Sequence, residues 1–225
     1  GTALVQDLGV DPARSMIIAN GVDASAIAMQ AAEPVNHHWF GEGTPPVILA
    51  VGRLTSQKNF EDLVEALPRV RQSIAARLLI LGEGTTRRRA ALVDRAARLG
   101  VADAVLLPGF EANPYKFLAR ASVVAVSSRW EGSSNVVLEA LACGTPVVAY
   151  GCPTGIAETI TPLDPSAVVP PGDVEALADA LTTRLLAPTD RSLVRAHAFK
   201  FDLAQTLVSY VEAFRASLRS DAQNR

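Results

Sequence analysis

Strand-like and helix-like segments alternate along most of this chain. Six short runs are continuously apolar, as in strands covered on both faces, at residues 47–54, 77–82, 104–109, 122–128, 146–150 and 167–170. Between and after them the pattern predicts helices at about 58–73, 85–99, 113–121, 134–143, 155–160 and 173–187. This alternation predicts an α/β fold, a Rossmann-like doubly wound parallel sheet.

The composition agrees with such a fold and disfavours other classes of protein. The chain has 225 residues, of which 49% are hydrophobic, and a net charge of -2, so no overall field attracts nucleic acid. No run reaches the roughly 18 apolar residues of a membrane span. Cys143 and Cys152 have no metal-ligand spacing and are expected as reduced thiols in the cytoplasm. The arginine-rich helix at 85–99 leaves peripheral contact with the inner face of a membrane open, although a solvated face explains it better.

The segment after the first strand has the residues of an anion site. Ligands of open α/β sheets bind beyond the carboxyl ends of the strands. Gly52 would let a ligand approach the backbone closely, and a helix is expected to start near Lys58. Arg53 and Lys58 place two cations beside that helix N-terminus, which suits a diphosphate. The alternative is two solvated loop cations.

The segment after the second strand half-resembles a dinucleotide motif. Gly82, Glu83 and Gly84 follow the pattern G-x-G-x-x-G, but Arg87 stands in place of the third glycine. A nicotinamide site is therefore disfavoured. Glu83 is a candidate to face a ligand, and a tight turn is the alternative explanation.

The stretch EGSSNVVLE places Glu131 and Glu139 eight positions apart. Such positions differ by about 80° on one helix, so the acids are better interpreted as a loop residue and a helix residue. A serine at 133 or 134 is a suitable N-cap, which puts Glu139 in the second turn. Glu139 is the only charge on an apolar helix and should be buried and hydrogen-bonded. The alternative is that Glu131 is a surface charge and Glu139 is paired internally.

The start of this helix predicts a second anion site facing the one near Lys58. Its free amides would point back toward the strand ends, at Ser134, Asn135 and Val136. A sugar nucleotide would then place phosphates between the two sites and hydroxyl groups at the two acids.

Five motifs together carry a family resemblance. They are GRLTSQKNF, LLILGEG, VLLPGF, SSRWEGSSNVVLEALACGTPVVAY and CPTGIAE. Their order and approximate spacing resemble the nucleotide-sugar domain of retaining GT-B glycosyltransferases of family 4, over nearly the whole chain from about residue 18. ANGVD at 19–23 is similar to the segment where that family's chain enters its C-terminal domain. Within the family, the chain looks most like bacterial enzymes that build surface polysaccharides or lipid-linked glycans.

The resemblance implies one half of a GT-B fold and a role for each site residue. Arg53 and Lys58 would hold the donor diphosphate, Glu131 would contact hydroxyls of the transferred sugar, and these three would act in catalysis. Glu139 would accept hydrogen bonds from the ribose. The remaining donor-binding positions are Gly52 and Glu83, the base-flanking turn from Leu107 to Phe110, and the phosphate-binding amides at Ser134, Asn135 and Val136.

The implied reaction is retaining transfer of a hexose or N-acetylhexosamine to a glycan or lipid-linked acceptor. A UDP-sugar is the favoured donor, and a GDP-sugar stays open. No metal is required, because Arg53, Lys58 and the helix N-terminus would stabilise the leaving diphosphate and no Asp-x-Asp pair is present. The sequence departs from the family at Ser133-Ser134, Gly151 and Ile156-Ala157, which leaves the sugar and acceptor open.

The family comparison also implies a division of the chain. Residues 1–23 would be a remnant of an N-terminal domain and interdomain segment, 24–187 the donor-binding domain, and 188–225 C-terminal helices. Apolar residues at helical spacing predict a terminal amphipathic helix, at Leu203, Leu207, Tyr210, Val211 and Phe214. The acceptor site would lie in the N-terminal domain, so the chain is expected to bind donor and transfer poorly. An epimerase-like domain and a non-catalytic nucleotide-binding module are the alternatives.

Overall fold

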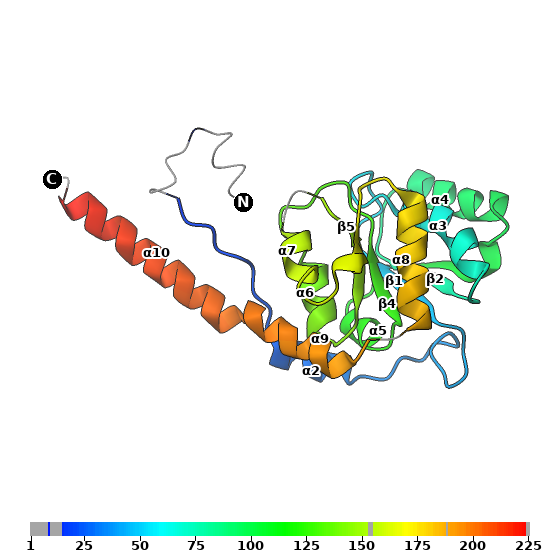
Figure 1. Cartoon of the computed structure of the whole chain (residues 1–225), viewed down its shortest axis with the longest axis horizontal. Coiled ribbons are helices and arrows are strands. Elements are labelled where there is room, and N and C mark those ends of the chain that lie inside the picture. The colour runs from blue at the N-terminus through cyan, green and yellow to red at the C-terminus, as the bar shows by residue number, and fades with distance from the viewer. Residues whose placement is uncertain (1–8, 10–14, 153–154, 188, 224–225) are drawn as a thin grey trace.

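A computed structural model describes residues 9, 15–152, 155–187 and 189–223. The expected interdomain segment is therefore described mainly from Ser15 onward, and Pro153 and Thr154 of the CPTG motif lie outside the described residues. Figure 1 shows an α/β body from which the last helix extends.

The described chain forms a six-stranded parallel sheet, as predicted from the alternating pattern. Its strands are β1 (Val47–Val51), β2 (Arg77–Leu81), β3 (Val105–Gly109), β4 (Val123–Val126), β5 (Val147–Tyr150) and β6 (Val168–Val169). Their order is β3-β2-β1-β4-β5-β6, so the winding reverses between β1 and β4. At that junction Ile48 pairs with Val123 and Leu49 with Val124. Ligands of this fold bind at the carboxyl edge of such a switch point.

Every helix predicted between or after the strands is present and starts within two residues of its predicted start. The helices are α2 (Ala24–Ala31), α3 (Phe60–Arg71), α4 (Thr86–Arg98), α5 (Tyr115–Leu118), α6 (Asn135–Ala142), α7 (Ile156–Ile160), α8 (Val174–Leu186), α9 (Arg191–Ala198) and α10 (Leu203–Gln223). Short 3-10 turns lie at Ala102–Ala104, Pro165–Ala167 and Phe199–Phe201. The sequence patterns missed α2, although Asp23 is a good N-cap and accepts the amides of Ser25 and Ala26.

The sheet is covered on both faces, which explains its continuously apolar strands. Helices α3, α4 and α8 pack on one face, and α6 packs on the other, where α2, α5 and α9 pack against it in turn (Figure 1). Central strand residues such as Leu49, Ala50 and Ile80 are fully buried. The carboxyl edge of the sheet is left for the loops that follow β1, β2, β3 and β4.

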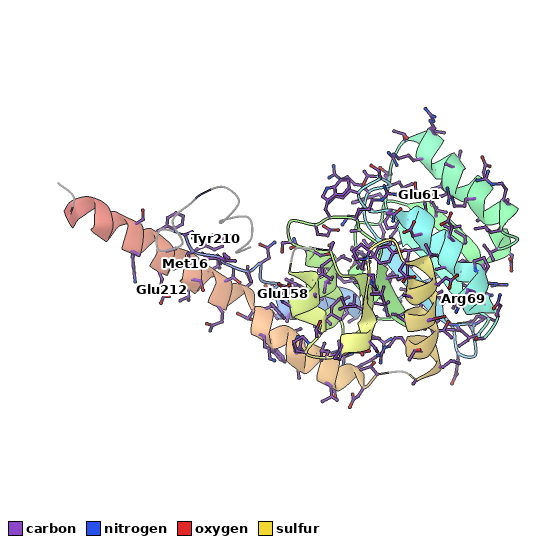
Figure 2. All side chains as sticks on the ribbon, turned by 45° about the horizontal axis from the view of Figure 1, so that its top comes forward. Met16, Glu61, Arg69, Glu158, Tyr210 and Glu212 are labelled. Atoms are coloured by element: carbon purple, nitrogen blue, oxygen red, sulfur yellow. The ribbon has the colours of Figure 1, made fainter. Side chains whose placement is uncertain are left out.

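The C-terminal stretch forms α9, a 3-10 turn and α10, and the five apolar residues predicted to share an amphipathic helix all lie in α10. Asp202 causes the break between α9 and α10, since its carboxylate accepts the amides of Ala204 and Gln205 and caps a new helix. Val22 bonds to Phe201 and Leu203 on either side of it. Beyond this anchor α10 extends away from the body, and Figure 2 shows Tyr210 and Glu212 projecting from it. Its predicted apolar residues are exposed.

No helix in the described part of the chain combines the length and apolarity that crossing a membrane requires.

Candidate functional site

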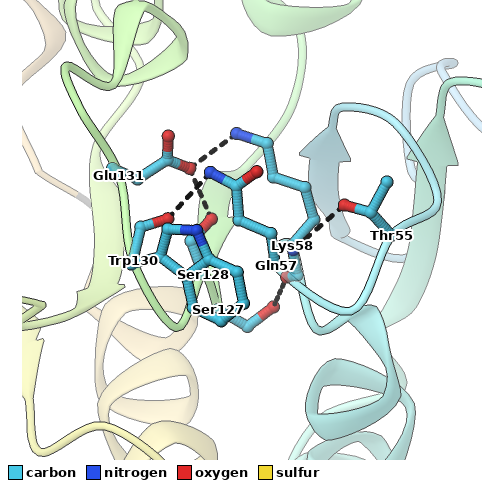
Figure 3. Close-up of polar contacts among 7 residues, drawn as sticks. All are labelled: Thr55, Gln57, Lys58, Ser127, Ser128, Trp130 and Glu131. Atoms are coloured by element: carbon cyan, nitrogen blue, oxygen red, sulfur yellow. Dashed lines mark hydrogen bonds and ion pairs between the residues drawn. The ribbon is translucent and has the colours of Figure 1, made fainter.

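Two loops meet at the switch point of the sheet. The first follows β1 at residues 52–59, and the second follows β4 at residues 127–134. The Gln57 side chain donates to the carbonyl of Trp130 at 2.9 Å (Figure 3). The Arg129 amide donates to the carbonyl of Gln57 at 2.8 Å. These reciprocal bonds hold the two loops together.

The centre of this loop pair is an ion pair between two predicted site residues. Lys58 Nζ lies 2.6 Å from Glu131 Oε1, and the Ser128 hydroxyl donates to the same oxygen at 2.5 Å. Figure 3 shows the other carboxylate oxygen pointing away from both donors. Glu131 is only 7% exposed, so the alternative that it is a surface charge is wrong. A buried carboxylate needs such partners.

The glycine that follows β1 makes room for a side chain of the same loop. A Cβ on Gly52 would lie 3.0 Å from Lys58 Cε and 3.3 Å from its Cδ. The aliphatic part of Lys58 thus lies against this glycine, and the approach of a ligand to its backbone stays a prediction. Gly82 is tighter still, since its φ is 146° and a Cβ there would lie 1.9 Å from the Gly52 carbonyl oxygen. The two loops after β1 and β2 thus pack backbone against backbone.

The two predicted diphosphate-binding cations differ in their surroundings. Arg53 is exposed, and its guanidinium has no ion-pair or hydrogen-bond partner among the residues that the structure describes. Lys58 is held by Glu131 and precedes α3, which begins at Phe60, within two residues of its predicted start near Lys58. Asn59, a buried N-cap in the left-handed region with φ of 50°, lies between Lys58 and this helix. Arg53 is therefore the freer cation at this edge.

The start of α6 is close to its predicted form. Ser134 is the N-cap and Glu139 lies in the second turn, as expected. The Asn135 amide donates to the Ser133 carbonyl at 3.1 Å, so it is not free as predicted. The Asn135 side chain accepts from Asn20 at 2.8 Å, which ties the helix start to the segment before α2. The third predicted amide, at Val136, belongs to a half-buried residue of the first turn.

Glu139 is less enclosed than its apolar helix implied. It is half-buried, and the only hydrogen-bond contact that its carboxylate makes within the described residues is the Tyr115 hydroxyl at 3.5 Å. Burial raises the pKa of the Glu139 carboxyl, and burial together with the neighbouring Glu139 raises the pKa of Tyr115. The carboxylate borders a cavity of about 220 Å³ beside Gly21, Val22 and α2. Among the described residues, the alternative of internal pairing is therefore represented only by this long Tyr115 contact.

The predicted base-flanking turn is shorter than expected. Leu107 lies in β3 with 3% of its surface exposed, so its side chain belongs to the core, which disfavours the predicted contact with a base. Phe110 follows the strand and is 73% exposed. Glu83 is exposed too, and its carbonyl accepts the Leu54 amide at 2.8 Å, which agrees with the tight-turn explanation. Of these positions, Phe110 and Glu83 present side chains at the carboxyl edge of the sheet.

Three side chains of the site were missed from the sequence. Ser128 lies three residues before Glu131 in the same loop, and a hydroxyl at that spacing from an acid was a usable signal. Trp130 is 53% exposed although its carbonyl is tied to Gln57. Tyr115 lies 24 residues before Glu139, and no local pattern connects them. Across the described ranges, no group of three or more His, Cys, Asp or Glu side chains is placed to hold a metal ion.

The sequence matches a family model and several curated proteins. Residues 45–187 match the model described as "Glycosyl transferases group 1". One similar protein is the N-acetylgalactosamine-N,N'-diacetylbacillosaminyl-diphospho-undecaprenol 4-alpha-N-acetylgalactosaminyltransferase of Campylobacter jejuni, 35% identical over 155 residues, which cover 69% of this chain and 40% of that protein. Another is the D-inositol 3-phosphate glycosyltransferase of Segniliparus rotundus, 30% identical over 233 residues, which cover 97% and 51%. The chain thus spans about half or less of the length of these relatives.

Solved structures show the same fold. Anabaena Alr3699/HepE in complex with UDP is similar with a TM-score of 0.82 and 23% identity, over 96% of this chain and 61% of that one. The lipopolysaccharide outer core galactosyltransferase WaaB in its apo form has a TM-score of 0.77 and 19% identity, over 96% and 59%. Such enzymes have the GT-B fold, and this chain corresponds to one half of it.

Proposed function

Because the chain belongs to the glycosyl transferases group 1 family, we propose that it is the donor-binding half of an enzyme that transfers a sugar from a nucleotide sugar. The proposed acceptor is a glycan or a lipid-linked glycan. The relatives are about twice as long as the part that matches, and we expect their remaining length to carry the acceptor site.

The observation that carries this proposal is the placement of Arg53 beside the Lys58–Glu131 pair at the switch point. The Arg53 guanidinium is exposed and has no partner among the described residues, and it lies in the same loop as Lys58, so this loop brings positive charge to the edge where this fold binds ligands. The N-terminus of α6 follows Glu131 by four residues and adds the partial positive charge of a helix start. These groups are suited to a diphosphate.

The rest of a nucleotide sugar fits the two acids. The outward oxygen of Glu131 is available for a hydroxyl of the transferred sugar, while Lys58 and Ser128 hold the other oxygen. Glu139 borders its cavity with only a long contact to Tyr115, so it can accept hydrogen bonds from ribose hydroxyls. Uridine is the favoured base, supported by the UDP in the similar HepE structure.

The proposed chemistry is retaining transfer with departure of the diphosphate leading attack by the acceptor. Negative charge then develops on the leaving group, where Arg53, Lys58 and the α6 N-terminus would stabilise it. Neither glutamate needs to act as a nucleophile. Glu131 is engaged by a cation and a hydroxyl on one oxygen, and Glu139 is assigned to the ribose. Both acids position the donor.

Calorimetric titration with UDP, GDP and ADP tests this proposal. We expect UDP to bind and Glu139→Ala to weaken binding at least about tenfold, because it removes charge-assisted hydrogen bonds. Glu33→Ala is the matched control, since it removes an exposed carboxylate on the segment after α2 and should leave the affinity unchanged. Absence of any nucleotide binding at millimolar concentration, or equal effects of the two variants, would refute the proposal.

A further inference from the structure

Two buried serines, Ser127 and Ser128, begin the loop that follows β4. The Ser127 hydroxyl lies 2.9 Å from the carbonyl oxygens of both Lys58 and Asn59, and it can donate to either. The Ser128 hydroxyl donates to Glu131 Oε1 at 2.5 Å. Neighbouring hydroxyls thus hold two different parts of the site, because Ser127 bonds to the backbone of the first loop and Ser128 bonds to the acid of the second (Figure 3).

The two partners of Glu131 Oε1 differ in how firmly they are held. The Lys58 side chain is 20% exposed and carries its ammonium on a long, flexible chain. This ammonium is also proposed to donate to the diphosphate, so its position depends on the ligand as well as on Glu131. The Ser128 hydroxyl is carried on a short side chain that is only 1% exposed, directly after a central strand. Ser128 is therefore the fixed partner of the carboxylate, and Lys58 is the movable one.

We propose that Ser128 is a positioning residue that keeps Glu131 directed at the transferred sugar while Lys58 also donates to the diphosphate, and this inference rests on the proposed function. Within the described chain, Lys58 and Ser128 are the only side chains that bond to this carboxylate. Both bond to Oε1, and Figure 3 shows the second oxygen pointing away from them. Fixing one oxygen gives the other a defined direction. Because Ser128 is almost fully buried, it acts through Glu131 and does not touch the donor.

This role predicts a loss of affinity that is selective for the sugar. Calorimetry on the full chain would measure UDP and four donors, which are UDP-glucose, UDP-galactose, UDP-N-acetylglucosamine and UDP-N-acetylgalactosamine. The measured quantity is the ratio of the affinity for the tightest of these donors to the affinity for UDP. Ser128→Ala should lower this ratio about five- to tenfold, the range expected when a carboxylate loses one hydrogen bond that directs it. The affinity for UDP itself should be unchanged, since UDP lacks the sugar that Glu131 is proposed to contact.

Ser127→Ala is the matched control for this variant. It removes an equally buried hydroxyl from the neighbouring residue and leaves the contact between Ser128 and Glu131 in place. Both variants should lower the melting temperature, because each removes a buried hydrogen bond. Only Ser128→Ala should change the ratio of donor affinity to UDP affinity. A purely structural role of Ser128 would lower the stability and leave this ratio unchanged.

A double-mutant cycle tests whether Ser128 acts through Glu131. Glu131→Ala alone should lower the ratio at least as much as Ser128→Ala does, and combining the two should cause no further loss. An unchanged ratio in either single variant, or losses that add in the double variant, would overturn the inference alone. Binding of UDP without binding of any of the four donors would overturn it too. Failure of UDP itself to bind would instead remove the proposed function.

Discussion

Lys58 Nζ lies 2.6 Å from Glu131 Oε1, and the two residues come from loops 73 positions apart in the chain. The pair connects the loop after β1 to the loop after β4, at the junction where the winding of the sheet reverses. Both residues are proposed to contact the donor, yet they also hold each other before it binds. An ammonium group has three donors, so Lys58 can keep Glu131 and still donate to a phosphate.

Breaking this pair should destabilise the fold. Lys58→Met leaves the Glu131 carboxylate buried without a cation, and we expect it to lower the free energy of unfolding by about 3 kcal/mol. Lys116→Met is the control, because its pair with Glu111 at 3.3 Å is more accessible and should contribute less than about 1 kcal/mol. Urea unfolding measures both. Equal losses would mean that the Lys58 pair has no special structural role.

Arg53 should matter for ligand binding and not for stability. Its side chain is exposed and unpaired within the described chain, so Arg53→Ala should change the free energy of unfolding by less than about 0.5 kcal/mol. UDP affinity should fall about tenfold, as expected for the loss of one charge-assisted bond to phosphate. Arg89→Ala, an exposed arginine on α4, should leave both quantities unchanged. Retained UDP affinity in Arg53→Ala would contradict the proposed diphosphate site.

Removing the charge of Glu139 should weaken UDP binding and increase the stability of the fold, and the gain in stability should depend on pH. Burial raises the pKa of the Glu139 carboxyl in the folded state. The protonated carboxyl therefore contributes its whole stabilisation of the fold below the unfolded-state pKa. This stabilisation is lost as the pH rises through the folded-state pKa. At pH 7 the folded state therefore holds this carboxylate at a cost. Glu139→Gln should raise the melting temperature at pH 7, and the gain should shrink toward about pH 4, near the ordinary carboxyl pKa.

The same variant should bind UDP about tenfold more weakly at pH 7, because a neutral amide accepts ribose hydrogen bonds less strongly. Thermal unfolding from pH 4 to 8 and one titration at pH 7 measure the two effects. A melting temperature that falls at pH 7 would show that the Glu139 carboxylate has stabilising partners in the free chain.

The contact of Gly82 with Gly52 should not tolerate a side chain. A Cβ at position 82 would lie 1.9 Å from the Gly52 carbonyl oxygen, and its φ of 146° is strained for other residues. Gly82→Ala should cost more than about 3 kcal/mol or prevent folding, since backbone cannot give way as a flexible side chain can. Gly41→Ala, where a Cβ meets only Thr44 Cγ2 at 3.5 Å, should cost far less. Similar melting temperatures for the two variants would contradict this packing.

The secondary structure was largely predictable because its signals are local. Continuous apolar runs identified all six strands, and helix starts such as Ser134 agreed with capping preferences. The predicted helices were wrong where an N-cap residue was overlooked, or where an N-cap residue started a new helix within an apolar periodic stretch. Asp23 begins α2, which was missed, and Asp202 caps α10 within the C-terminal stretch.

The site was predictable only in outline. From the sequence, Arg53, Lys58 and Glu131 could be placed in loops that follow strands of one parallel sheet, because loops after parallel strands share its carboxyl edge. Only the tertiary structure decided that Lys58 covers Gly52 and pairs with Glu131, while Glu139 is left with a long contact to Tyr115. The physical reason is that such partners are chosen by how distant loops and helices pack. Neither periodicity nor turn chemistry records that packing.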